Sequence, residues 1–250
     1  DFVSYELRGS MEPYRLRILC ERGPMHQLGL GFRVDTQDLV SILVNIGLNT
    51  HSVRGASLDL TGRVGVNPYL DLHFAYNAPK WPTLNARACF RWADRNNFIS
   101  GDNNFSIAFH QYTQELYFSN MRWSHFDVQG GFRNQYFNVR QILAKDVLGD
   151  YDPQTISRDY PGFFLNARIE TLDNGYFPTR GVSAGIQGEF VSRLFVEGHP
   201  KPFAVVALDG QMPVAWGRFT LVPHGSARIL FGDDIPIVYA ISRSEERFSR

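Results

Sequence analysis

The chain has 250 residues, in which 25 lysines and arginines balance 25 aspartates and glutamates. This length fits one large β-domain or two small ones, and a formal net charge of zero argues against a nucleic-acid-binding protein, which usually carries a basic excess. Aromatic residues make up 14% of the chain, a high share for a soluble domain, and no apolar run approaches the roughly 18 residues that a membrane helix needs.

Strand patterns follow one another along the chain with almost no helical periodicity. Alternating apolar and polar residues predict strands with one wet and one apolar face. Many of these strands have about 9–11 residues, the length that crosses a bilayer at a tilt. A phase change within the seventh predicts a bulge or an exit from the membrane. The twelve predicted strands span residues 14–21, 26–34, 39–48, 57–66, 69–77, 83–93, 104–119, 123–143, 163–171, 181–192, 203–214 and 218–231.

Alternation alone leaves open which face points inward. A soluble barrel, such as a lipocalin-like binding protein, buries its apolar face, whereas a membrane barrel turns that face to lipid and lines its lumen with polar residues. Strand number, aromatics near strand ends and long connections on one side favour the membrane barrel. The long loops are predicted at residues 94–103, 144–162, 193–202 and after Gly232, and the short turns opposite them at 49–56, 78–82, 120–122, 172–180 and 215–217. The charged residues predicted to face the lumen are Asp59, Arg63, Arg87, Arg91, Asp127, Arg133, Arg168, Glu170 and Glu189.

The turn at residues 172–180 carries a family resemblance. At Asp173, Phe177, Pro178, Thr179 and Gly181 it resembles the turn of the bacterial surface antigen superfamily, which comprises outer-membrane barrels of the BamA, TamA and two-partner-secretion type. The resemblance implies an all-β, antiparallel transmembrane β-barrel with about eleven of sixteen strands present. It places the end of a POTRA domain at residues 1–24 and the N-terminal part of the barrel at residues 25–250.

The resemblance also implies a function in the bacterial outer membrane. Such a barrel anchors a polypeptide and assists its translocation or assembly through strand pairing at a seam, to which residues 26–34 would supply one side. The expected partners are outer-membrane lipid, the barrel assembly machinery, and a fused N-terminal domain or translocated polypeptide. The V-R-G-F motif of the sixth extracellular loop is not found, so no residue inherits the role of its arginine.

A finer resemblance involves residues 39–50, 91–96 and 110–120. These segments look most like Bacteroidetes barrels fused behind a patatin-like phospholipase, the PlpD-like arrangement of type V secretion. This implies a segment of a longer chain whose lipase residues lie upstream. The alternatives are an assembly-factor barrel of the BamA or TamA type and the soluble lipocalin-like protein.

The segment itself gives no prediction of catalysis or of a cofactor. Residues 181–185 match the G-x-S-x-G pattern, but a nucleophile elbow needs a strand before the serine and a helix after it, and Ser183 is instead predicted within a strand. Cys20 and Cys89 are far apart and have no metal-ligand spacing, so neither a disulfide nor a metal site is expected. Asp173 and Arg180 are expected to form an ion pair across the mouth of the turn.

Overall fold

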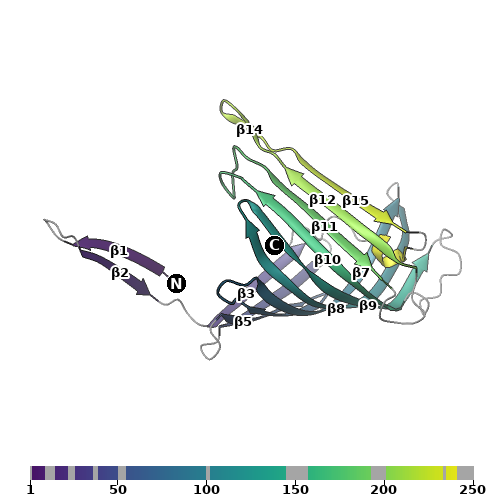
Figure 1. Cartoon of the computed structure of the whole chain (residues 1–250). Coiled ribbons are helices and arrows are strands. Elements are labelled where there is room, and N and C mark those ends of the chain that lie inside the picture. Colours follow the sequence, from purple (N-terminus) through teal and green to yellow (C-terminus); the bar gives the residue numbers. More distant parts are fainter. Residues whose placement is uncertain are drawn as a thin grey trace.

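The computed structural model of the protein is dominated by an antiparallel sheet of eleven strands that curves around its own interior (Figure 1). The structure describes residues 2–8, 15–21, 26–35, 39–49, 55–99, 102–144, 157–192, 201–232 and 235–240. Every strand pairs with the next sheet strand along the chain, from β3 at one edge to β15 at the other. The eleven strands are β3 (His26–Asp35), β4 (Leu39–Asn49), β5 (Ala56–Val64), β6 (Tyr69–Tyr76), β7 (Thr83–Ile99), β8 (Asp102–Trp123), β9 (Phe126–Ala144), β10 (Asp159–Glu170), β11 (Ser183–Val191), β12 (Phe203–Gln211) and β15 (His224–Phe231).

Two short hairpins accompany the sheet. The first joins β1 (Phe2–Arg8) to β2 (Arg15–Glu21), and Figure 1 shows it apart from the sheet. The sequence predicts β2 but β1 was missed, although its residues alternate in the same way. The second joins β13 (Val214–Trp216) to β14 (Phe219–Leu221) and projects from one end of the sheet. The assignment of the first hairpin to a POTRA domain stays a prediction.

The two faces of the sheet differ in composition. The inner face carries Glu115 and Arg133 and packs against the helix α2 (Ile237–Ala240), whereas the outer face carries exposed apolar side chains such as Leu116 and Phe163. In strands, successive side chains point to opposite faces, so period-two alternation produces this separation. No helix in the described part of the chain is long and apolar enough to cross a membrane.

The strands β7, β8 and β9 have 17, 22 and 19 residues, longer than predicted. The loop predicted at residues 94–103 is wrong, because β7 and β8 continue to pair until Ile99 lies opposite Asp102. Its asparagine and aspartate residues are typical of loops, but pairing with the neighbouring strand overrides that local preference. The loop predicted at residues 144–162 is too long at its end, since β10 begins at Asp159, and residues 145–156 lie outside the described part.

The phase change predicted in residues 104–119 coincides with a register shift. Pairing moves from Ala108 opposite Gln141 to Phe109 opposite Val139, so a bulge lies at this point with the extra residue on β9. The inner face also changes there from polar to apolar, because Ile107 and Phe109 are buried. Because the extra residue lies on β9, the alternation of β8 is unbroken, and the phase change in its sequence reflects the change in what covers the inner face.

The main apolar core lies on the inner face at one end of the sheet. Phe137, Tyr160 and Phe203 surround Tyr239 of α2, with ring centroids between 4.8 and 5.8 Å from its ring. Ile107 and Tyr160 are among the most completely buried side chains described. Residues after Gly232 were predicted as a loop, and within them α2 lies at one end of the sheet (Figure 1), where its Val238 and Tyr239 join the apolar core.

The C-terminal strands also differ from the prediction. The strand expected at residues 203–214 ends at Gln211, and the one expected at residues 218–231 splits into β14 and β15. The turn predicted at residues 215–217 becomes the tip of the β13–β14 hairpin, where Gly217 has a φ of 61°. A two-residue tip with positive φ suits glycine, which has no Cβ to clash.

Candidate functional site

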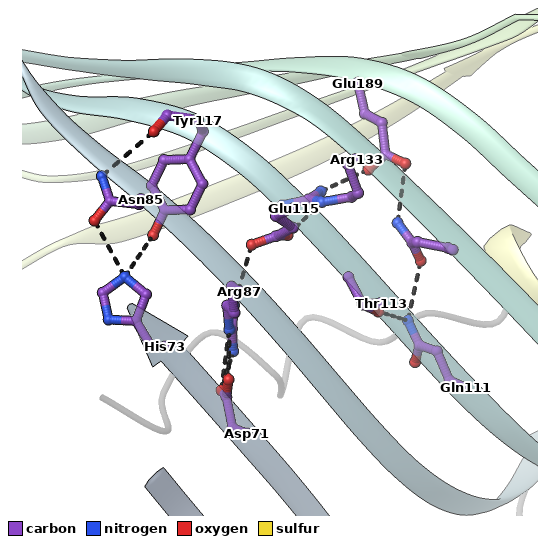
Figure 2. Close-up of polar contacts among 11 residues, drawn as sticks. Asp71, His73, Asn85, Arg87, Gln111, Thr113, Glu115, Tyr117, Arg133 and Glu189 are labelled. Carbon is purple, nitrogen blue, oxygen red and sulfur yellow. Dashed lines mark hydrogen bonds and ion pairs between the residues drawn. The ribbon is translucent and has the colours of Figure 1, made fainter. Parts of the chain in front are cut away.

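A row of charged side chains crosses the inner face of the sheet (Figure 2). Arg87 on β7, Glu115 on β8 and Arg133 on β9 lie directly opposite one another in the strand register. Asp71 on β6 and Glu189 on β11 extend the row at its ends, and these five residues form the charged row. Opposite charges at facing positions stabilise neighbouring strands, so the charged row links strands from β6 to β11.

The charges in the row alternate in sign and lie in direct contact. Arg87 Nε donates to the two Asp71 carboxylate oxygens at 2.9 and 3.0 Å, and Arg87 Nη1 lies 3.6 Å from Glu115 Oε2. Arg133 donates from Nε to Glu115 Oε1 at 2.6 Å and from Nη1 to Glu189 Oε2 at 2.8 Å. Three carboxylates and two guanidinium groups give the charged row a formal charge of −3 + 2 = −1.

Burial differs along the charged row and is greatest in its middle. The side chain of Glu115 is 4% exposed and that of Arg133 is 22% exposed, whereas Arg87 is 37% exposed. The Arg133 guanidinium also lies 4.3 Å from the centre of the Phe164 ring, a cation–π contact. Removing a charge from the middle of the row therefore leaves a more deeply buried ionic partner without its counter-charge than removing one near its end.

Glu189 connects the charged row to α2. Its Oε1 accepts a hydrogen bond from Gln135 Nε2 at 3.0 Å and another from the Tyr239 hydroxyl at 3.1 Å. Gln135 Oε1 in turn accepts from Gln111 Nε2 at 3.0 Å. Since Tyr239 is also part of the apolar core, α2 is held against the inner face by packing and by a charge-assisted hydrogen bond together.

A second polar cluster, built around His73, lies beside the row (Figure 2). His73 Nε2 lies 3.1 Å from Asn85 Oδ1 and 3.4 Å from the Tyr117 hydroxyl. The Asn85 amide donates to the Thr83 carbonyl at 2.9 Å and to Ser119 Oγ at 2.8 Å. Asn85 is buried, and these partners satisfy a polar group that burial would otherwise penalise.

The other six charged residues predicted to face the lumen do not belong to the charged row. Arg63 donates to the Asn67 carbonyl at 2.8 and 3.1 Å, and Asp127 lies 3.6 Å from Arg122. The remaining four are placed by strand pairing: Asp59 opposite Gly47 and His73, Arg91 opposite Tyr69 and Gln111, Arg168 opposite Asp127 and Gly185, and Glu170 opposite Ser183. The prediction that all nine line a lumen remains untested.

Asp173 organises the turn between β10 and β11. Its Oδ1 accepts the backbone N–H groups of Thr179 at 2.8 Å and Arg180 at 3.2 Å, and its Oδ2 accepts the Thr179 hydroxyl at 2.5 Å. These bonds, the hydroxyl bond foremost, lower the pKa of Asp173 from 3.8 to about 2. The ion pair predicted with Arg180 is wrong, because Asp173 binds the backbone of Arg180. Gly181 closes the turn with a φ of 102°.

Comparison with solved structures gives a match in fold. The structure of BamA from Haemophilus ducreyi lacking POTRA domains 1–3 superposes with a TM-score of 0.68 over 96% of this chain, at 14% sequence identity. The chain has the fold of a BamA barrel. It spans 48% of the length of that BamA chain, and the sheet in the described residues has two unpaired edges. No protein-family model and no curated protein matches the sequence.

Within this BamA-type sheet, the inner face offers ion pairing and hydrogen bonding. Ser183 lies at the start of β11 opposite Glu170, and its Oγ accepts a hydrogen bond from Arg168 at 3.2 Å. A strand follows this serine, so it does not occupy a nucleophile elbow. The described residues contain no group of three or more potential metal ligands from His, Cys, Asp and Glu, and Cys89 is a free thiol.

Three important residues of the site are not among those predicted from the sequence: Asp71, Glu115 and Tyr239. Asp71 and Glu115 lie on the polar faces of strands with alternating apolar and polar residues, so this alternation could have identified them as inner-face residues. Tyr239 had no such signal, because it belongs to a four-residue helix far along the chain from the strands it contacts. Its position depends on tertiary packing alone.

Proposed function

We propose that the chain is the N-terminal part of an outer-membrane β-barrel that anchors a polypeptide in the membrane and serves its translocation or assembly. The observation that carries this proposal is the inverted distribution of polarity. Leu116 and Leu165 on the outer face are 54% and 58% exposed, while Glu115 on the inner face is buried. A protein in water would leave these apolar side chains unfavourably solvated, whereas lipid would cover them.

The same distribution favours the membrane barrel over the soluble lipocalin-like alternative. A lipocalin-like interior needs the apolar face inside, but here ion pairs occupy the inner face across β6 to β11. Exposed aromatic side chains also gather in the turns at one end of the sheet, as an interfacial girdle would. They are Trp81, Trp123, Tyr176, Phe177 and Trp216.

The finer proposal is that the barrel carries a patatin-like phospholipase fused upstream, in the PlpD-like arrangement. It rests on the resemblance of residues 39–50, 91–96 and 110–120. By this proposal the segment contributes no catalytic residue, and its edge strands β3 and β15 take part in strand pairing. The barrel assembly machinery and membrane lipid would be its other partners.

The test uses the full-length protein in its own bacterium. We expect it in the outer-membrane fraction, resistant to carbonate extraction, and migrating faster on gels before heating than after, as folded barrels do. Protease added to intact cells should cleave a fused upstream domain that the barrel exports. Purification without detergent as a compact monomer would instead support the soluble alternative and overturn the proposal.

An assembly-factor barrel of the BamA or TamA type is the second candidate, and the BamA-type fold favours it. Depletion of the protein separates the two functions. An assembly factor would leave other barrels unfolded in the periplasm, whereas a dedicated anchor would affect only its own fused domain.

A further inference from the structure

A turn and the end of a nearby strand form a shallow groove at the aromatic-rich end of the sheet. The turn between β6 and β7 contributes residues 80–82, and the end of β8 contributes residues 120–123. The groove has a volume of about 430 Å³, is widely open to the surface, and is lined by Trp81 and Trp123, which are 76% and 84% exposed. A space of this size, open at the surface, suits a small charged group attached to a larger molecule.

The backbone at the groove adopts an uncommon conformation at two positions. Among the described residues, the non-glycine residues with positive φ are Lys80 at 73°, Asn120 at 61° and Ser124 at 58°. Lys80 and Asn120 line the groove, and Ser124 lies in the turn directly after β8. Left-handed conformations at non-glycine residues cost free energy and often occur at functional sites, so their coincidence here indicates a shaped site.

A bulge in β8 directs side chains into the groove. Phe118 pairs with Gly130 and Met121 pairs with Val128, so two residues of β8 lie opposite one of β9. The extra residue reverses the alternation, and Met121 and Trp123 join the outer face opposite Val128 and Phe126. Without the bulge, both side chains would point toward the inner face.

The charges of the groove favour an anion. Lys80 and Arg122 are its ionisable residues, and no carboxylate lines it. Lys80 has no ion-pair partner within the described residues, so it is available to an anionic partner. Arg122 alternates with Met121 and Trp123 and lies on the inner face opposite Asp127, 3.6 Å away, so it points away from the apolar outer face. Above the charges, Met121 and the facing pair Leu84 and Phe118 extend the apolar outer face.

We infer that the groove binds the phosphate headgroup of an anionic phospholipid, with the acyl chains lying along Met121, Leu84 and Phe118. This combination of an unpaired lysine, interfacial tryptophans and an adjacent apolar surface matches the three parts of such a lipid. The inference rests on the proposed membrane location, since a soluble protein would meet no bilayer at this end.

The experiment places the full-length protein in nanodiscs of phosphatidylcholine with or without phosphatidylglycerol. Trp92→Phe and Trp216→Phe substitutions leave the two groove tryptophans as the reporters within residues 1–250. Quenching of their emission by headgroup-spin-labelled phosphatidylglycerol should be stronger than by the matching phosphatidylcholine. Lys80→Asn, which keeps a residue that tolerates positive φ, should weaken the preference about fivefold, whereas Arg122→Gln, on the inner face, should leave it unchanged.

Arg218→Ala is the matched control, because Arg218 is an exposed cation beside exposed aromatics in the β13–β14 hairpin but lies outside the groove. Equal quenching by both lipids, or an equal loss in the control, would overturn the inference. Displacement by inorganic phosphate would assign the groove to a free anion instead and also overturn it. Failure of the protein to insert into the nanodisc refutes the proposed function, whereas insertion without lipid preference refutes this site alone.

Discussion

Arg133→Gln is predicted to be the most destabilising neutralisation in the charged row. Arg133 contacts Glu115 at 2.6 Å and Glu189 at 2.8 Å, so its loss removes a cation from two carboxylates at once. Glu115 would keep only Arg87, at 3.6 Å, while its side chain is 4% exposed. Leaving a buried carboxylate without its counter-charge in this way lowers the free energy of unfolding by about 3–5 kcal/mol.

Arg87→Gln should cost less, about 1–2 kcal/mol. Glu115 would retain its closer contact with Arg133, and Asp71 is more exposed and gains water in place of the guanidinium. Arg168→Gln is the control on the same face, because Arg168 and its partner Glu170 are both about half exposed and 3.6 Å apart. An exposed pair of this kind contributes about 0–1 kcal/mol.

Urea unfolding of the full-length protein in detergent micelles, followed by the gel shift of the folded barrel, measures the three variants. Adding Glu115→Gln to Arg133→Gln should recover stability, with a coupling of about 1–3 kcal/mol, because the uncompensated carboxylate is then removed. A cost for Arg133→Gln no greater than that for Arg87→Gln, or additive effects of Arg133→Gln and Glu115→Gln, would contradict this prediction.

Three further predictions concern the turn and the helix. The pKa of Asp173 is about 2 in the folded protein against 3.8 in the unfolded chain, so Asp173 contributes stability above pH 3.8 that is lost as the pH falls through 2. Asp173→Asn should therefore lower the stability at neutral pH and weaken its dependence on acid pH, measured by unfolding over a range of pH values. Gly181→Ala should destabilise by more than about 1 kcal/mol in the same unfolding assay, since its Cβ would lie 2.2 Å from a backbone oxygen, whereas Gly175→Ala, with nothing within 4 Å, should be nearly neutral. Tyr239→Phe should cost about 1 kcal/mol by losing the bond to Glu189, and Tyr239→Ala about 3–5 kcal/mol by opening a cavity; equal costs would contradict the division between packing and hydrogen bonding.

The order of the strands follows from the sequence because each pairs with its neighbour in the chain. Period-two alternation is a local signal, and every strand of the large sheet overlaps a predicted range. The C-terminal end of β7 and the N-terminal end of β8 could not be predicted from the sequence. Their Asn- and Asp-rich residues favour loops locally, but the two strands pair with one another there. Local preference locates strands well and their ends poorly.

The charged row illustrates the same limit for the site. Alternation places Arg87 and Arg133 on polar faces, but the contact between Arg87 and Asp71 depends on the register of β6 and β7 across 16 residues. Register is set by turn geometry and by packing of the whole sheet, which no single strand encodes. The sequence therefore indicates which residues are polar-facing without indicating which of them pair.

The position of α2 explains why the inner face is polar in one part and apolar in another. Around the charged row, neighbouring strands supply opposite charges, so a polar inner face is satisfied without any cover. Where α2 lies, its Val238 and Tyr239 cover Phe137 and Phe203, and burial stabilises an apolar surface instead. Because Tyr239 also donates to Glu189, moving α2 away would expose this apolar surface and remove a partner from the charged row in the same step. The helix and the row therefore stabilise one another, and the stability of either should depend on both.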